Sequence, residues 1–218
     1  VVKEHSGEHM VDPRIVYISD TTEIGTLYTK AELTALRECC DRNNLSLFMD
    51  GARLASALTS PENDLTLADL ARLTDVFYIG GTKMGALFGE AVVINNDKLL
   101  KHFFPLIKQH GALLAKGRLL GVQFKALFSK GLYEEIGREA VAKALRLKAA
   151  FVEKGYQVEV DSPTNQQFFR LPNILIDRLK QEASFEYWGP RGQQESVVRF
   201  VTSWATSDED IDQLIALL

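Results

Sequence analysis

The sequence predicts an α/β fold with a mainly parallel sheet, followed by a smaller α+β domain at the C-terminal end. Short apolar runs alternate with longer stretches that have the period of an amphipathic helix, which is the order of elements in a parallel sheet with crossover helices. The runs are apolar almost throughout, as in strands that are buried on both faces. After residue 155 the pattern changes to short strands interleaved with helices.

The first part of the chain, residues 1–115, is expected to be part of a large domain. Its strands are predicted near 14–19, 45–50, 75–80 and 90–94, each an apolar run. A helix is predicted to begin near Thr29, because Glu32 follows at the spacing of a capping box. After a loop through Ser60 and Pro61, a short helix is expected near Leu65–Leu73.

The remainder divides into linking helices at 116–155 and a small C-terminal domain at 156–218. The pattern is almost entirely helical from 96 to 155, and its longest periodic run is 127–155. The small domain is expected to contain a helix around 173–181 and a terminal helix capped by Thr206, Ser207 or Asp208. Its strands are predicted at 156–161, 166–171, 184–188 and 196–204.

Composition excludes several classes of partner. The chain has 25 Lys and Arg against 29 Asp and Glu among 218 residues, a net charge of −4, and no basic run, which argues against nucleic acid and anionic membrane surfaces. No apolar stretch approaches the roughly eighteen residues of a membrane span, and the first residues do not resemble a signal peptide. The adjacent Cys39 and Cys40 suit a reducing compartment, so we expect a cytoplasmic protein.

A metal-site pattern at the N-terminal end is interpreted as a coincidence. Residues 5–9 read H-x-x-E-H, which in zinc hydrolases places two histidines on one helical face. Gly7 weakens such a helix and no third ligand has a suitable spacing, so we expect a solvated segment and no metal.

Two ionisable residues stand at the carboxyl ends of neighbouring predicted strands, where open α/β sheets place their ligand chemistry. Asp50 ends the run LSLFMD, and Lys83 follows DVFYIG in the glycine-rich loop GGTKMG. An arbitrary lysine is most often a surface residue, but this one is joined by Asp50 and Arg53 and by glycines that allow close approach of a flat or phosphorylated group. The set suits pyridoxal phosphate. Such a lysine forms a Schiff base, an acid keeps the ring nitrogen protonated, and the Thr82 hydroxyl is a candidate donor to the phosphate.

Five segments carry a resemblance that extends over nearly the whole chain, namely ISDTTEIGTLYTKAEL, FMDGARLASAL, DVFYIGGTKMGALFGEAVVI, GALLAKGRLLGVQF and VRFVTSWATSDEDI. They resemble the threonine aldolase and β-eliminating lyase branch of the fold-type I, aspartate-aminotransferase-like enzymes that use pyridoxal phosphate. The resemblance implies that Lys83 is the Schiff-base lysine, that Asp50 pairs with the pyridine nitrogen, and that Arg53 and Arg199 hold the substrate carboxylate. Arg118 resembles a basic residue that reaches a cofactor phosphate, in a neighbouring subunit of a homodimer or homotetramer with shared active sites.

The resemblance also implies that an N-terminal part of the large domain is absent from this chain. In the family that part supplies the phosphate-binding turn and the group that stacks on the pyridine ring. Because the strand at 14–19 is expected to lie inside a parallel sheet, we expect an uncovered strand edge and an apolar face beside it.

The function implied is an aldolase-type lyase that cleaves L-threonine, L-allo-threonine or a similar β-hydroxy amino acid to glycine and an aldehyde. Another pyridoxal phosphate reaction remains open, namely β-elimination, transamination or racemisation, as does a catalytically silent member or fragment of the fold. A nucleotide-binding domain is disfavoured, because GGTKMG has neither the G-x-G-x-x-G nor the G-x-x-x-x-G-K-[ST] spacing.

Overall fold

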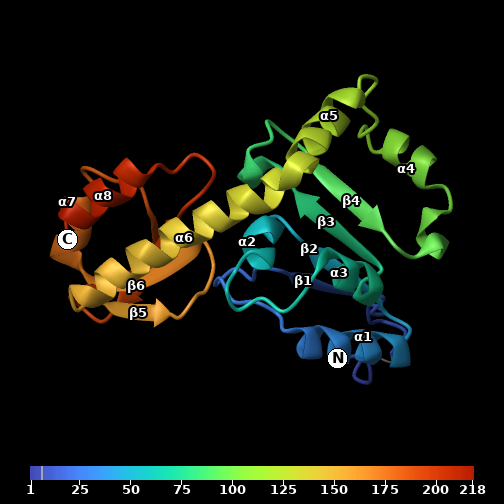
Figure 1. Cartoon of the computed structure of the whole chain (residues 1–218). Coiled ribbons are helices and arrows are strands. Elements are labelled where there is room, and N and C mark those ends of the chain that lie inside the picture. The colour runs from blue at the N-terminus through green and yellow to red at the C-terminus, as the bar shows by residue number, and fades with distance from the viewer. Residues whose placement is uncertain (6) are drawn as a thin grey trace.

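The computed structural model describes residues 1–5 and 7–218 and has two lobes joined by the long helix α6 (Leu132–Glu153). Figure 1 shows the first lobe around strands β1 to β4 and the second around β5 to β8, with α6 running across both. In the described part of the chain, no helix combines the length and the apolar character that crossing a membrane requires.

Sheet A, in the first lobe, has the strand order β1-β2-β3-β4. Its strands are β1 (Ile15–Ser19), β2 (Ser46–Asp50), β3 (Val76–Gly80) and β4 (Glu90–Ile94). The first three are parallel and β4 runs antiparallel to β3, which confirms the expected mainly parallel sheet. The carboxyl ends of β2 and β3 therefore meet at one edge of the sheet.

In the described part of the chain, helices cover one face of sheet A and leave the other open. They include α1 (Lys30–Arg42), α2 (Leu54–Leu58) and α3 (Leu67–Leu73). The predicted capping box is present at α1, where Thr29 and Glu32 each accept a hydrogen bond from the other's backbone N–H. The sequence did not predict α2, because its five residues are too few to show a helical period.

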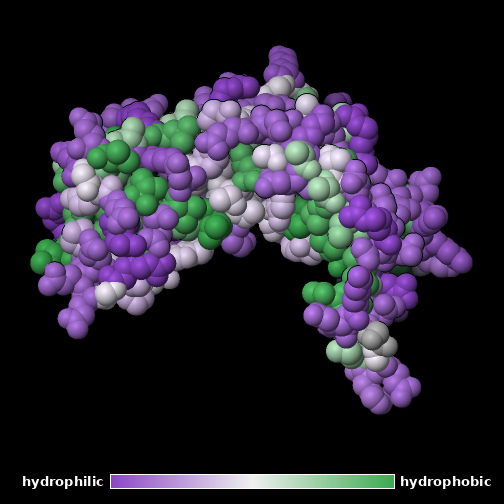
Figure 2. Space-filling view, turned by 90° about the horizontal axis from the view of Figure 1, so that it is seen from below, coloured by the Kyte–Doolittle hydropathy of each residue, from purple (hydrophilic) through white to green (hydrophobic). Residues whose placement is uncertain are grey.

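The core lies between these helices and the covered face, onto which alternate strand residues such as Leu47, Met49 and Phe77 project. On the opposite face, Tyr17, Phe48 and Tyr78 form an aromatic row, with Tyr17 59% exposed. Apolar residues are also visible on the surface in Figure 2. Within residues 1–5 and 7–218, no strand pairs with the outer edge of β1. The expected uncovered edge and apolar face are both present.

The segment between the lobes is helical but interrupted by loops. It contains the 3-10 turns η2 (Asp97–Leu100) and η3 (Ser129–Gly131) and the helices α4 (Phe103–Gln109) and α5 (Arg118–Leu127) before α6. The region expected to be almost entirely helical thus consists of several short elements followed by one long helix.

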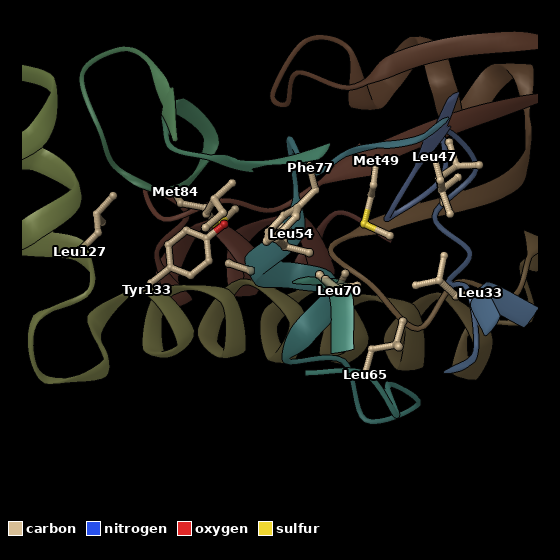
Figure 3. Close-up of a cluster of buried hydrophobic side chains, with 14 of the residues drawn as sticks. Leu33, Leu47, Met49, Leu54, Leu65, Leu70, Phe77, Met84, Leu127 and Tyr133 are labelled. Carbon is tan, nitrogen blue, oxygen red and sulfur yellow. The ribbon is translucent and has the colours of Figure 1, made fainter. Parts of the chain in front are cut away.

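Helix α6 contributes side chains to both cores. Near its start, Tyr133 is fully buried beside Met84 and Leu54, and its hydroxyl donates to the Gly80 carbonyl at 3.2 Å (Figure 3). Further along, Phe151 stacks on Phe169 of the second lobe with ring centroids 4.0 Å apart. The helix therefore holds the two sheets in a fixed relation.

Sheet B, in the second lobe, is antiparallel with the order β5-β6-β8-β7. Its strands are β5 (Gln157–Val160), β6 (Gln166–Pro172), β7 (Glu186–Arg191) and β8 (Glu195–Val201). Its helices are α7 (Asn173–Leu179) and α8 (Asp208–Ala216). Of the predicted caps for the terminal helix, the structure uses Ser207, in a capping box with Asp210.

Direct hydrogen bonds also tie the lobes together, close to the carboxyl end of β1. Ser162 Oγ donates to the Gly25 carbonyl at 2.8 Å, and Gln166 Nε2 donates to Thr21 Oγ1 at 3.2 Å. Because these buried bonds link residues far apart in sequence, they hold one end of sheet B against the carboxyl edge of sheet A.

Candidate active site

Asp50, at the end of β2, is held by hydrogen bonds on both carboxylate oxygens. Tyr17 donates to Oδ2 at 2.5 Å and the Ala52 N–H donates to Oδ1 at 2.9 Å. Partial burial opposes ionisation, but hydrogen bonds from Tyr17, Tyr78 and Ala52, together with the charge of Lys83, lower the pKa of Asp50. The side chain is therefore an anion at neutral pH on the open face of sheet A.

Lys83 lies in the 3-10 turn η1 (Thr82–Met84) directly after β3. Although the residue as a whole is exposed, partial desolvation of its amine lowers its pKa first and the positive charge of Arg53 second, while Asp50 acts in the opposite direction. The loop is fixed on both sides: the Gly81 N–H donates to Glu90 Oε2 at 2.9 Å, and Gln123 of α5 accepts from the Leu87 N–H at 2.7 Å. The amine is thus more readily deprotonated than that of an ordinary lysine.

The glycines around Lys83 are explained by backbone packing. A Cβ on Gly80 would lie 2.2 Å from the Ala52 carbonyl oxygen, and one on Gly81 would lie 2.6 Å from the Gly89 carbonyl oxygen. Gly85 has a φ of +91°, a conformation that favours glycine, and ends the turn. Backbone carbonyls of the segment after β2 and of the residue before β4 therefore account for Gly80 and Gly81.

Arg53 directly precedes α2, on the segment that follows Asp50. Burial and then the positive charge of Arg199 lower the pKa of Arg53, partly offset by Glu23, Glu186 and Asp50. Its Nε is buried and has no hydrogen-bond partner in the described part of the chain. A buried guanidinium N–H without an acceptor is a natural binding point for an anion.

Arg199 comes from the other lobe and points into the protein, although strand alternation alone leaves its direction open. It is 8% exposed, and its Nη1 donates to Gln166 Oε1 at 2.8 Å. Its Nη2 forms an ion pair with Glu186, and its guanidinium carbon lies 4.9 Å from the ring centroid of Trp188. Like that of Arg53, its Nε has no partner among the described residues. The positive charge of Arg199 acts on Arg53, so the structure brings the two arginines within range of electrostatic interaction.

Thr82 and Arg118 are both exposed, the first beside Lys83 and the second at the first residue of α5. Within residues 1–5 and 7–218 no polar contact joins Arg118 to Lys83, Asp50 or Arg53. The suggested roles of Thr82 and Arg118 at a phosphate therefore stay predictions.

The H-x-x-E-H pattern at residues 5–9 includes Ser6, which lies outside the described residues. Among the residues that the structure does describe, no group of His, Cys, Asp and Glu side chains is arranged to hold a metal ion.

Several polar residues at the site were missed by the sequence reasoning. They are Tyr17 and Tyr78 at Asp50, Glu90 at the lysine loop, and Gln166, Glu186 and Trp188 at Arg199. The signal for Tyr17 was its place on a strand next to the one that ends in Asp50. Glu186 could be found only through the register of β7 against β8, where it lies opposite Arg199.

Comparison with known proteins gives consistent matches. The family model described as beta-eliminating lyase matches residues 1–172. A low specificity L-threonine aldolase of Pseudomonas sp. is 30% identical over 213 residues, which cover 95% of this chain and 60% of that protein. The solved threonine aldolase of Leishmania major is 47% identical, with a TM-score of 0.96 over 99% of this chain and 63% of that one.

A more distant structure shows the fold alone. An aspartate aminotransferase of Thermus thermophilus is 15% identical, with a TM-score of 0.67 over 94% of this chain and 56% of that one. The chain spans about three-fifths of the length of these relatives, 60% of the Pseudomonas protein and 63% of the Leishmania protein.

Proposed function

Because the chain belongs to the beta-eliminating lyase family, we propose that the protein is a pyridoxal phosphate-dependent aldolase that cleaves L-threonine, L-allo-threonine or a similar β-hydroxy amino acid to glycine and an aldehyde. The observation that carries this proposal is the convergence of an ionised Asp50, a lysine of lowered pKa and two arginines whose Nε atoms are buried without a partner among the described residues. The low specificity L-threonine aldolases and the Leishmania enzyme support the substrate class.

The residues present fit the cofactor. A pyridinium nitrogen needs an anionic partner, and the hydrogen bonds of Tyr17 and the Ala52 N–H keep Asp50 in that form. A lysine that reacts with an aldehyde needs its neutral form, and burial together with Arg53 favours it at Lys83. Pyridoxal phosphate, when bound, supplies an electron sink for the pair of electrons left on the substrate Cα.

The two arginines would hold and orient the substrate. Arg53 and Arg199 each have a buried Nε without a partner in the described part of the chain, and both can donate to the same carboxylate. Fixing the carboxylate fixes the rotation about the bond between the substrate nitrogen and Cα. This rotation decides which of the Cα bonds is aligned for cleavage, so the arginines would keep the bond to the carboxylate out of that position and leave the Cα–Cβ bond able to take it.

Thr82 and Arg118 are proposed to contact the cofactor phosphate, Arg118 from a second copy of the chain in a homodimer or homotetramer. Support comes from their exposure: both side chains are free to reach a group outside this chain. A cytoplasmic location is proposed as well, supported by the free thiols of Cys39 and Cys40.

The deciding experiment supplies L-threonine to the cofactor-loaded enzyme and assays the products. Glycine and acetaldehyde in equal amounts are expected. Ammonia with a keto acid would instead indicate β-elimination, transfer of the amino group would indicate an aminotransferase, and the D-isomer would indicate a racemase. Absence of any product while the cofactor is bound would indicate a catalytically silent member of the fold.

A further inference from the structure

The register of sheet B places a competing anion beside Arg199. Glu186 on β7 and Phe168 on β6 are the direct cross-strand partners of Arg199 on β8. Directly opposite residues in an antiparallel sheet project to the same face, so the three side chains lie together. The carboxylate of Glu186 forms an ion pair with Nη2 of Arg199. This is the same arginine that is proposed to bind the substrate carboxylate.

The two partners of this ion pair differ in exposure. The side chain of Arg199 is 9% exposed, whereas that of Glu186 is 58% exposed. A buried cation is costly without an anion beside it, so Arg199 needs a partner whether or not a substrate is present. Glu186 can rotate into water and regain its hydration at little cost. Of the two residues, the glutamate is therefore the one able to leave.

Arg199 has other contacts that would keep it in place when Glu186 leaves. Its Nη1 donates to Gln166 Oε1 at 2.8 Å, and this amide is itself buried and bonded to Thr21. Trp188 faces the guanidinium, with the ring centroid 4.9 Å from its central carbon. The indole is in turn held by an edge contact to Phe168 at 5.1 Å. Gln166 and Trp188 thus fix the guanidinium plane independently of Glu186.

We propose that Glu186 is an exchangeable counter-ion of Arg199, which neutralises the guanidinium in the free enzyme and is displaced by the carboxylate of the incoming amino acid. The proposal rests on the proposed function for the identity of the substrate, but the exchange itself concerns any small carboxylate. Because the glutamate competes with the ligand for one guanidinium, it raises the KM for substrate and leaves the chemical step unchanged.

The test compares the cofactor-loaded wild-type enzyme with its Glu186→Gln variant. Acetate serves as the probe, since it has a carboxylate but no amine, and its Kd is measured by calorimetry. Removing the competing charge is expected to lower the Kd for acetate about two- to fivefold, the size expected for a partly exposed ion pair. The KM for L-threonine should fall by a similar factor with kcat unchanged.

A matched control is Glu195→Gln, which removes the same charge from the same sheet. Glu195 lies at the other end of β8, four residues and roughly 13 Å from Arg199. It should leave the Kd and the KM at their wild-type values, which separates the local exchange from a change in net charge. If Glu186→Gln does not fold, Glu186→Asp provides the second measurement, because its shorter side chain cannot keep the same contact and should shift the Kd in the same direction.

Three results would overturn the proposal. A weaker affinity for acetate in Glu186→Gln would show that Glu186 orients Arg199 for the ligand, and an unchanged affinity would show that no competition exists. Failure of both the wild type and the variant to bind acetate would also refute it. Tighter acetate binding by an enzyme that does not cleave threonine would instead refute the proposed function and leave the exchange intact.

Discussion

Tyr17 donates a hydrogen bond to Asp50 Oδ2 at 2.5 Å, so a tyrosine on the edge strand β1 stabilises the charge of an acid on β2. The bond depends on the parallel register of the two strands, which places Tyr17 opposite Phe48, two residues before Asp50. The ionisation of Asp50, the residue proposed to pair with the cofactor ring, therefore depends in part on a side chain of the neighbouring strand.

Replacing Tyr17 with Phe should raise the pKa of Asp50, because the hydrogen bond favours the ionised carboxylate. The shift can be followed by NMR titration of the labelled carboxyl carbon. Tyr17 and Phe48 are stacked with ring centroids 5.4 Å apart, and Phe retains that contact. An unchanged carboxyl titration would mean that the bond contributes nothing to the charge of Asp50.

Replacing Asp50 with Asn should leave the cofactor bound but lower turnover severely, because an amide does not keep the pyridine nitrogen protonated. We expect a loss of at least about a hundredfold in kcat. The visible spectrum reports cofactor binding separately from activity. Activity close to that of the wild type would make Asp50 a structural residue.

Lys83→Ala should remove the visible absorbance that a covalently held cofactor gives and reduce turnover by several orders of magnitude. Lys98→Ala is a suitable control, since Lys98 is a lysine in the turn η2 after β4. If the absorbance and the activity both survive in Lys83→Ala, the assignment of the reactive lysine is wrong.

Arg199→Lys should raise the KM for the amino acid sharply and change kcat less. Lysine keeps the positive charge but loses the flat fork that donates two parallel hydrogen bonds to a carboxylate, and it also loses the stacking on Trp188. Steady-state kinetics and circular dichroism of the same preparation would separate binding from folding. An unchanged KM in a folded variant would remove Arg199 from the substrate site.

The stability of the fold should vary with pH because of Asp20. This residue is only 3% exposed, and its Oδ1 has no partner among the described residues. Burial raises its pKa to about 7, although the Tyr28 N–H hydrogen bond acts against this. The folded state therefore holds this proton more tightly than the unfolded chain. Its contribution to the free energy of unfolding falls as the pH rises from about 4 to about 7 and stays lost above that.

Asp20→Asn abolishes this titration. Between pH 5 and pH 7 the variant should gain stability relative to the wild type, with a slope of at most about 1.4 kcal/mol per pH unit. Urea unfolding at several pH values measures the difference. A constant difference across this range would show that Asp20 has an ordinary pKa in the folded protein.

The local parts of the fold were predictable from the sequence. The capping box of Thr29 and Glu32 involves residues three apart, and the apolar runs of β2 and β3 are continuous, so short windows contain the whole signal. The positions of Asp50 and Lys83 at neighbouring strand ends followed from the order of those runs.

The contacts that set the charge of Asp50 and the partners of Arg199 could not be predicted from the sequence, because they depend on pairing between distant segments. Tyr17 lies 33 residues from Asp50, and Glu186 reaches Arg199 only through the register of β7 and β8. The sequence suggests that Gly80 leaves room for a ligand, whereas the structure shows the Ala52 carbonyl, in the segment after β2, in that space. Composition cannot distinguish these reasons for a glycine, since both require the absence of a side chain.

The 22 residues of α6, about 33 Å in length, make the two lobes a single cooperative unit in unfolding. Tyr133 belongs to one core and Phe151 to the other, so fraying of this helix would open both. Gly137 fits tightly here, because a Cβ would lie 2.6 Å from the Ala55 carbonyl oxygen. Heating should therefore melt sheets A and B in one transition, and cutting the chain within α6 should leave neither half able to fold independently.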